Sequence, residues 1–222
     1  MTDVDYCEGH ARETLGLNAR STENVAKGCE AAGAMMVYVS TDYVFNGKKG
    51  AYKETDETDP ISVYGKTKLE GEKAVQRMGI DYCIARTSVL YGWHEKYNFA
   101  TWVINELKGG KRVNIVKDQT ASPTLADNLA KVLLDMVGEG VEGMFHAAGS
   151  ERASRYRFAL KIADVFGLDE SLINAIPSDE LKQKAKRPAD SSLDVSKIEK
   201  RLGIRMMGID EGLKKLREDA KR

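Results

Sequence analysis

The feature that most constrains the fold is a near-continuous apolar run at residues 35–40, which lies between two segments of helical character. Such a run is typical of a strand covered on both faces, as in a parallel sheet. Further strands are expected at residues 81–86, 113–116 and 144–147. Helices are expected at residues 9–32, 62–79, 97–109, 124–137, 155–166, 194–202 and 209–220. This alternation predicts an α/β fold with a parallel sheet and crossover connections.

Composition and charge exclude several classes of protein. The 222 residues include 34 basic and 34 acidic side chains, so no bulk attraction to nucleic acid or to an anionic membrane is implied. No apolar stretch approaches the roughly 20 residues that span a bilayer. Residues 1–6 lack the basic and apolar parts of a signal peptide, and the three scattered cysteines predict neither disulfides nor a zinc site. We therefore expect a cytoplasmic protein, and no metal site is predicted.

One glycine motif is misleading. Residues 138–143 match the dinucleotide fingerprint G-x-G-x-x-G. That motif binds a pyrophosphate only where a strand precedes it and a helix follows it, because the helix N-terminus holds the anion. Here a helical pattern precedes the motif and a strand pattern follows it. We predict a helix-to-strand turn with no phosphate.

The clearest chemical signal is Tyr64 followed by Lys68 near the start of a predicted helix. Residues four apart share one helical face. An ammonium beside a phenol stabilises the phenolate and lowers the pKa of the tyrosine, which suits an acid/base catalyst. Carbonyl reduction needs such a group, since a proton must reach the oxygen while a hydride adds to carbon. Many helices contain the same pair by chance as a solvated face.

Other polar residues are expected at the same edge of the sheet. The first predicted strand ends in Ser40, Thr41 and Asp42, and the second ends in Thr87 and Ser88. In open α/β sheets, ligands bind at the carboxyl ends of the strands. The alternative is that Thr41 and Asp42 only cap a turn.

Several motifs, in order, resemble the dTDP-4-dehydrorhamnose reductase family of extended short-chain dehydrogenases/reductases. These motifs lie at residues 37–47, 64–72, 86–92, 98–99, 118–124 and 187–194, and residues 2–8 with Asn18 also match. The resemblance implies a partial Rossmann-like parallel sheet. It divides the chain into residues 1–150, the dinucleotide-binding domain, and residues 151–222, mainly a smaller substrate-binding lobe, with the two lobes interleaved.

The resemblance also implies roles for individual residues. Tyr64 would give a proton to the C4 oxygen of a nucleotide-linked 4-keto sugar, and Lys68 would hold the nicotinamide ribose of NADPH or NADH. Thr41 would hydrogen-bond the reacting oxygen, and Asp42 would position the sugar or the tyrosine. Thr87 and Ser88 would line the nicotinamide side. The remaining substrate-binding residues would be Tyr43, Asn98 and Arg187, although Arg187 could equally be a surface arginine before a proline.

Two departures from the family pattern affect these expectations. Val89 stands where the family commonly has a tryptophan that contacts the sugar nucleotide, so the exact sugar is left open. The family also opens with a glycine-rich cofactor motif in roughly 60 residues of βαβ structure that have no counterpart here. We therefore expect an N-terminally truncated chain with weakened cofactor binding, whose missing half belongs to a longer natural protein or to a second chain.

Other functions remain open on the sequence alone. One is a non-catalytic interaction protein resembling the regulatory subunit of methionine adenosyltransferase, and another is reduction or epimerisation of a different sugar nucleotide. A homodimer is also possible.

Overall fold

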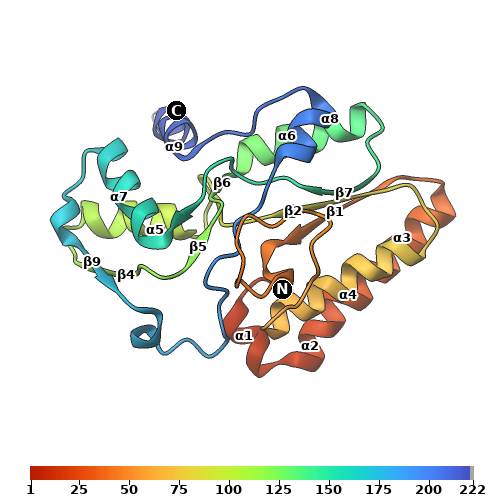
Figure 1. Ribbon diagram of the computed structural model, residues 1–222, viewed down its shortest axis with the longest axis horizontal. Helices are drawn as coiled ribbons and strands as arrows, with labels where there is room; N and C mark the ends of the chain where they lie inside the picture. Colours follow the sequence, from red (N-terminus) through yellow and green to blue (C-terminus); the bar gives the residue numbers. More distant parts are fainter. Residues whose placement is uncertain (221–222) are drawn as a thin grey trace.

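The computed structural model describes residues 1–220, and its centre is a three-stranded parallel sheet. The strands are β1 (Met36–Thr41), β2 (Tyr82–Thr87) and β7 (Gly143–His146), in the order β1-β2-β7. The register pairs Thr41 with Thr87, so β1 and β2 end together. The predicted α/β fold with a parallel sheet is confirmed (Figure 1).

Helices cover both faces of this sheet (Figure 1). On one face lie α3 (Ser21–Ala32) and α4 (Val63–Arg77), which pack on Tyr38 and Ile84. On the other face lie α6 (Ala126–Gly138) and α8 (Ser196–Leu202). Their buried side chains form a second cluster with Cys83, Ala85 and Phe145 of the sheet. Because both faces are covered, the strands read as apolar runs in the sequence.

The predicted helix at residues 9–32 is interrupted in the structure. It consists of α2 (Ala11–Leu15), a π-helical turn at Gly16–Arg20 and α3, and it follows the short helix α1 (Val4–Gly9). Hydroxyl side chains compete for backbone carbonyls along this stretch, since Thr14 donates to His10 O and Thr22 donates to Asn18 O. Such bonding weakens a regular helix. The predicted end of this helix at residue 32 is confirmed, since Gly33 follows α3 with a left-handed φ of 60°.

A second group of elements lies beside the main sheet. It contains α5 (Phe99–Lys108), α7 (Arg155–Phe166) and α9 (Ile209–Asp219), which share one apolar core. The predicted strand β4 (Val113–Val116) pairs with β9 (Ile173–Ile176) in a separate parallel sheet, and no strand was predicted at the position of β9. This core takes residues from both sides of position 150, so the proposed division of the chain there remains a prediction.

Short elements complete the described chain. Strand β3 (Leu90–Tyr91) pairs with β6 (Thr124–Leu125), and β5 (Thr120–Ala121) pairs with β8 (Ala153–Ser154). Turns of 3₁₀ helix lie at Asp42–Val44 (η2), Glu170–Leu172 (η3) and Ser178–Leu181 (η4). The misleading glycine motif lies between the end of α6 at Gly138 and the start of β7 at Gly143, which confirms the helix-to-strand turn.

A buried ion pair joins α4 to β2. Arg86 donates to both carboxylate oxygens of Glu72, at 2.9 and 2.7 Å, and Ser40 donates to the same carboxylate at 2.5 Å. The side chains of Arg86 and Glu72 are 3% and 1% exposed. Two charges so deeply buried are tolerated because they pair with each other, while Arg86 Nη1 has no hydrogen-bond partner within residues 1–220.

Two negative findings concern only residues 1–220. None of their helices is both long enough and apolar enough to cross a membrane. Within the same residues, His, Cys, Asp and Glu side chains do not gather in groups that could hold a metal ion.

Candidate active site

Close packing against the end of β1 fixes the first turn of α4. Ser62 caps this helix by accepting a hydrogen bond from Gly65 N at 3.2 Å. A Cβ atom at position 65 would collide with the carbonyl oxygen of Tyr43. Glycine at position 65 therefore lets the helix approach the strand end and brings Tyr64 to it.

Tyr64 meets Thr41 on the same side of the sheet. Burial raises the pKa of Tyr64 to about 12, and a hydrogen bond with the Thr41 hydroxyl acts in the opposite direction. The ring of Tyr43 contacts the ring of Tyr64 edge-on, with centroids 5.7 Å apart. The phenol is thus neutral at physiological pH and shielded from water, which is the state of a proton donor.

Lys68 lies one turn along the same helix, but its ammonium contacts other groups. Its Nζ donates to Val39 O at 2.8 Å and lies 4.0 Å from the centre of the Tyr38 ring. Burial lowers the pKa of Lys68 to about 8, against an opposing effect of Glu72. The expected lowering of the Tyr64 pKa by Lys68 is not what this structure shows, because burial dominates the ionisation of both groups.

Asp42 is the most enclosed acid at the site, with 2% of its surface exposed. Its Oδ2 accepts hydrogen bonds from Ser88 at 2.7 Å and from Ser191 at 2.5 Å, and its Oδ1 accepts one from Thr41 at 3.1 Å. Burial raises the pKa of Asp42 above its ordinary value, and the hydrogen bonds from these three hydroxyls oppose that rise only in part. Asp42 therefore makes more than a local turn cap, since it joins three segments that are far apart in the sequence.

Thr87 and Ser88 lie at the end of β2, but their side chains have different surroundings. Ser88 points to Asp42 and also lies 3.4 Å from Ser122 N. Thr87 Oγ1 is buried and has no hydrogen-bond partner within residues 1–220. A buried hydroxyl without a partner is costly. Thr87, with the ammonium of Lys68, is thus suited to hold the polar end of a cofactor.

A cavity of about 340 Å³ opens beside Tyr43. Arg155 and Arg187 line it together with an apolar wall that includes Phe99 and Trp102. The guanidinium of Arg155 lies 5.1 Å from the centre of the Phe99 ring and lowers the pKa of Tyr43, which burial otherwise raises. Two guanidinium groups in one cavity are suited to bind a diphosphate.

Arg187, which the sequence singled out, already has a carboxylate partner. Its Nη1 and Nη2 donate to the two oxygens of Asp5 at 3.1 and 3.0 Å. The two guanidinium nitrogens that could bind two phosphate oxygens therefore bind the carboxylate of Asp5 in α1. The side chain of Arg187 is 11% exposed, so Arg187 is more than a surface arginine.

Asn98 and Val89 do not lie on this cavity. Asn98 caps α5 by accepting from Thr101 N at 3.2 Å, and its amide donates to Gly92 O at 2.6 Å. It lines a different cavity, with Trp93 and Leu90. Val89 has a left-handed φ of 43°, which is strained for a β-branched residue.

Sequence reasoning missed Arg155 and Ser191. Arg155 is the first residue of α7, in a polar stretch with Arg152 and Arg157, and no spacing distinguishes it from them. Ser191 lies in a motif that was noted, but the sequence does not tell which of its two serines turns inward. The positions of both side chains depend on contacts between segments that are far apart in the sequence.

A buried tyrosine, a lysine one helical turn later and a hydroxyl at the end of the neighbouring parallel strand define an oxidoreductase of the short-chain dehydrogenase/reductase class. Residues 1–222 match the model of the RmlD substrate binding domain. The chain belongs to this dTDP-4-dehydrorhamnose reductase family, as its motifs predicted.

Related sequences span most of this chain. A probable low-salt glycan biosynthesis reductase of Haloferax volcanii is 36% identical over 96% of this chain and 72% of its own length. A dTDP-4-dehydrorhamnose reductase of Aggregatibacter actinomycetemcomitans is 35% identical over 97% of this chain and 77% of its own. Methionine adenosyltransferase 2 subunit beta of Bos taurus is 36% identical over 90% of this chain and 62% of its own.

A solved structure agrees with this assignment. The dTDP-4-dehydrorhamnose reductase of Bacillus anthracis, determined in complex with NADP, superposes with a TM-score of 0.94 at 30% identity. The match covers 99% of this chain and 78% of that one. The Rossmann-like fold and the reductase family are thereby confirmed.

Proposed function

We propose that this protein catalyses the NAD(P)H-dependent reduction of a nucleotide-linked 4-keto sugar, as its relatives named dTDP-4-dehydrorhamnose reductase do. The observation that carries the proposal is the contact of Tyr64 with Thr41 at the ends of α4 and β1. A protonated phenol beside a strand-end hydroxyl is suited to bind and protonate a carbonyl oxygen, which supports this reaction.

Each of the site residues is assigned a separate role in this reduction. Tyr64 donates the proton, because its raised pKa keeps it protonated at physiological pH. Thr41 and Asp42 orient that phenol. Lys68 and the unpartnered hydroxyl of Thr87 hold the nicotinamide end of NADPH or NADH, which supplies the hydride.

The substrate's diphosphate is assigned to the cavity beside Tyr43. Arg155 and Arg187 are the cations that line it, and Tyr43 lies between this cavity and Tyr64. The apolar wall with Phe99 and Trp102 is suited to cover the nucleoside. Asn98 is engaged in capping α5, so we assign it to positioning the wall rather than to direct contact with the sugar.

Three further points belong to the proposal. Residues 1–150 contain the reacting groups, while Arg155 and Arg187 come from residues 151–222, which supports the expected substrate-binding lobe. The cysteines are free thiols, which suits a cytoplasmic enzyme. A homodimer, or a second chain that supplies further cofactor-binding structure, also belongs to the proposal.

Turnover tests this function directly. The protein is incubated with dTDP-4-dehydrorhamnose and NADPH, and loss of NADPH absorbance is followed while the product is identified by NMR. We expect stoichiometric formation of dTDP-rhamnose. A protein that binds both compounds but consumes no NADPH with this or any related 4-keto sugar nucleotide would contradict the proposal.

The relationship to methionine adenosyltransferase 2 subunit beta favours one second candidate, a regulatory interaction protein. This candidate predicts that the chain forms a stable complex with a methionine adenosyltransferase catalytic subunit and changes its kinetics. Gel filtration of the mixture distinguishes the two candidate functions, because the reductase proposal predicts that the two proteins do not co-elute.

A further inference from the structure

The segment around Ser191 and Ser192 lies between two loops. Ser191 N donates to Thr120 O at 2.9 Å on one side, and Tyr52 N donates to Ser192 O at 2.9 Å on the other. Successive side chains of an extended segment point to opposite sides. The two neighbouring serines therefore face different parts of the molecule.

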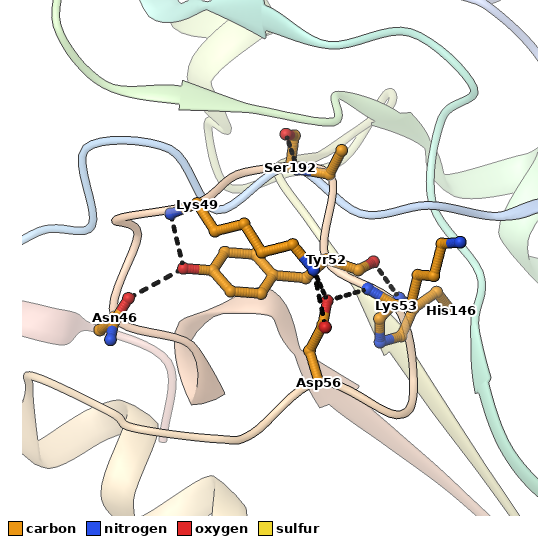
Figure 2. Close-up of polar contacts among 8 residues, drawn as sticks. Asn46, Lys49, Tyr52, Lys53, Asp56, His146 and Ser192 are labelled. Carbon is orange, nitrogen blue, oxygen red and sulfur yellow. Dashed lines mark hydrogen bonds and ion pairs between the residues drawn. The ribbon is translucent and has the colours of Figure 1, made fainter.

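Ser192 faces the loop after β1. Its hydroxyl accepts from Ala51 N at 2.8 Å and donates to Asp190 at 2.6 Å. Figure 2 shows this loop, in which the Tyr52 hydroxyl bonds to Asn46 and to the backbone of Lys49 while Ser192 lies beside it. The Ser192 hydroxyl therefore holds this loop.

Ser191 faces the other way, into the buried environment of Asp42. Its hydroxyl is 2.5 Å from Asp42 Oδ2, which also accepts from Ser88. The charged and titratable groups that face Asp42 are Arg155 of α7, the neighbouring Tyr43 and Tyr64 of α4. Ser191 is thus the contribution of the C-terminal part of the chain to this cluster.

The hydrogen bonds to Asp42 fix the position of the Thr41 hydroxyl. The hydroxyls of Ser88, Ser191 and Thr41 each donate their one hydrogen to the carboxyl group of Asp42. Thr41 Oγ1 also accepts from Tyr43 N at 3.2 Å. Thr41 Oγ1 is thereby held between Asp42 and the backbone of Tyr43, where it contacts the phenol of Tyr64. Asp42 therefore fixes the position of the hydroxyl that lies against Tyr64.

We propose that Ser191 is a positioning residue for the reduction: by holding the carboxylate of Asp42 it fixes the Thr41 hydroxyl, and through it the phenol of Tyr64. This inference rests on the proposed function. It explains why the motif at residues 187–194, remote in sequence from α4, contributes to the site. Ser191 acts only through Asp42 and touches no reacting atom.

Substitution of each serine gives a matched test. In Ser191→Ala, Asp42 loses one donor to a buried charge, so its ionisation constant falls about tenfold or more. Carboxyl ¹³C NMR titration of Asp42 in the full chain should show this rise in pKa. The value of kcat should fall about tenfold, the KM for the sugar nucleotide should not change, and the acid limb of the kcat profile should move to higher pH.

Ser192→Ala is the control, because it removes an equally buried hydroxyl that does not touch Asp42. It should lose similar thermal stability but keep the wild-type Asp42 titration and kcat. Ser191→Cys keeps a weak donor and should fall between wild type and Ser191→Ala. An unchanged Asp42 titration in Ser191→Ala, or an equal shift in Ser192→Ala, would overturn the inference.

The titration needs no turnover. If the wild-type protein reduces no sugar nucleotide, the proposed function fails by itself, while the Asp42 titration still decides whether Ser191 holds this carboxylate. If the wild-type enzyme is active and Ser191→Ala matches it in kcat and in pH profile, the positioning role alone is wrong.

Discussion

The hydroxyl of Tyr64 and the ammonium of Lys68 lie one turn apart on the same helix, but their surroundings differ. Tyr64 is enclosed by Thr41, Tyr43 and Asp42, and its pKa is raised to about 12. Lys68 rests on Val39 O and the Tyr38 ring, and its pKa is lowered to about 8. At the residue scale, burial separates the two groups into a proton donor and a cation that titrates close to neutrality.

The lowered pKa of Lys68 predicts a pH dependence of cofactor binding. The folded protein loses this proton near pH 8, whereas the unfolded chain keeps it up to about 10.5, so Lys68 makes stability rise between these values. In the folded protein, the charge of Lys68 and its attraction for an anionic cofactor are lost around pH 8. Fluorescence titration should therefore show NADPH affinity falling above pH 8.

Lys68→Arg provides the control for this prediction, since a guanidinium stays charged at these pH values. Its NADPH affinity should remain flat to higher pH. Wild-type affinity that does not change between pH 7 and pH 10, the range spanning the pKa of about 8, would contradict the assignment of Lys68.

Arg155 gives a second prediction at this scale. Removing a charge-assisted hydrogen bond costs about 1.5–3 kcal/mol, so Arg155→Met should raise the KM for the nucleotide sugar roughly tenfold to a hundredfold. The value of kcat should change little. Arg157→Met is the matched control, because Arg157 is on the same helix but lines a different cavity. Equal KM values in the two variants would exclude Arg155 from the substrate site.

At the scale of elements, the approach of α4 to the end of β1 controls the site. Gly65 permits that approach because the carbonyl of Tyr43 occupies the position of a Cβ. Gly65→Ala should cost about 1–3 kcal/mol of stability and displace Tyr64 from Thr41, with a large loss of kcat. Gly28→Ala in the exposed part of α3 meets no atom within 4 Å and should be neutral or stabilising. Urea unfolding and steady-state kinetics measure both effects, and a fully active Gly65→Ala would contradict the packing argument.

The ion pair between Glu72 and Arg86 links the same helix to β2. Arg86→Met leaves the Glu72 carboxylate buried and unpaired, so it should lose about 3–5 kcal/mol in urea unfolding. The double variant Glu72→Leu with Arg86→Met should recover most of this loss, since no buried charge remains. If the double variant is the less stable of the two, the pair contributes more than the cost of burying it.

At the scale of the whole molecule, the sequence predicted the elements better than their partners. The apolar run at residues 35–40 and the helix that carries Tyr64 and Lys68 were predicted because both signals are local. The pairing of β4 with β9 was not predicted, because residues 173–176 include polar Asn174 and form no long apolar run. The convergence on Asp42 was also hidden, since Ser88 and Ser191 reach it from 46 and 149 residues away.

Tyr64 is the proposed proton donor, and its substitution is the most direct test of the proposed mechanism. The measurement is kcat for NADPH-dependent reduction of dTDP-4-dehydrorhamnose by wild type, Tyr64→Phe and the control Tyr97→Phe, which alters a residue 66% exposed on the surface. Loss of a general acid costs about 10²–10⁴-fold, so Tyr64→Phe should lose at least a hundredfold in kcat with little change in KM, and Tyr97→Phe should match wild type. A Tyr64→Phe variant that turns over at the wild-type rate would contradict the claim that this phenol delivers the proton.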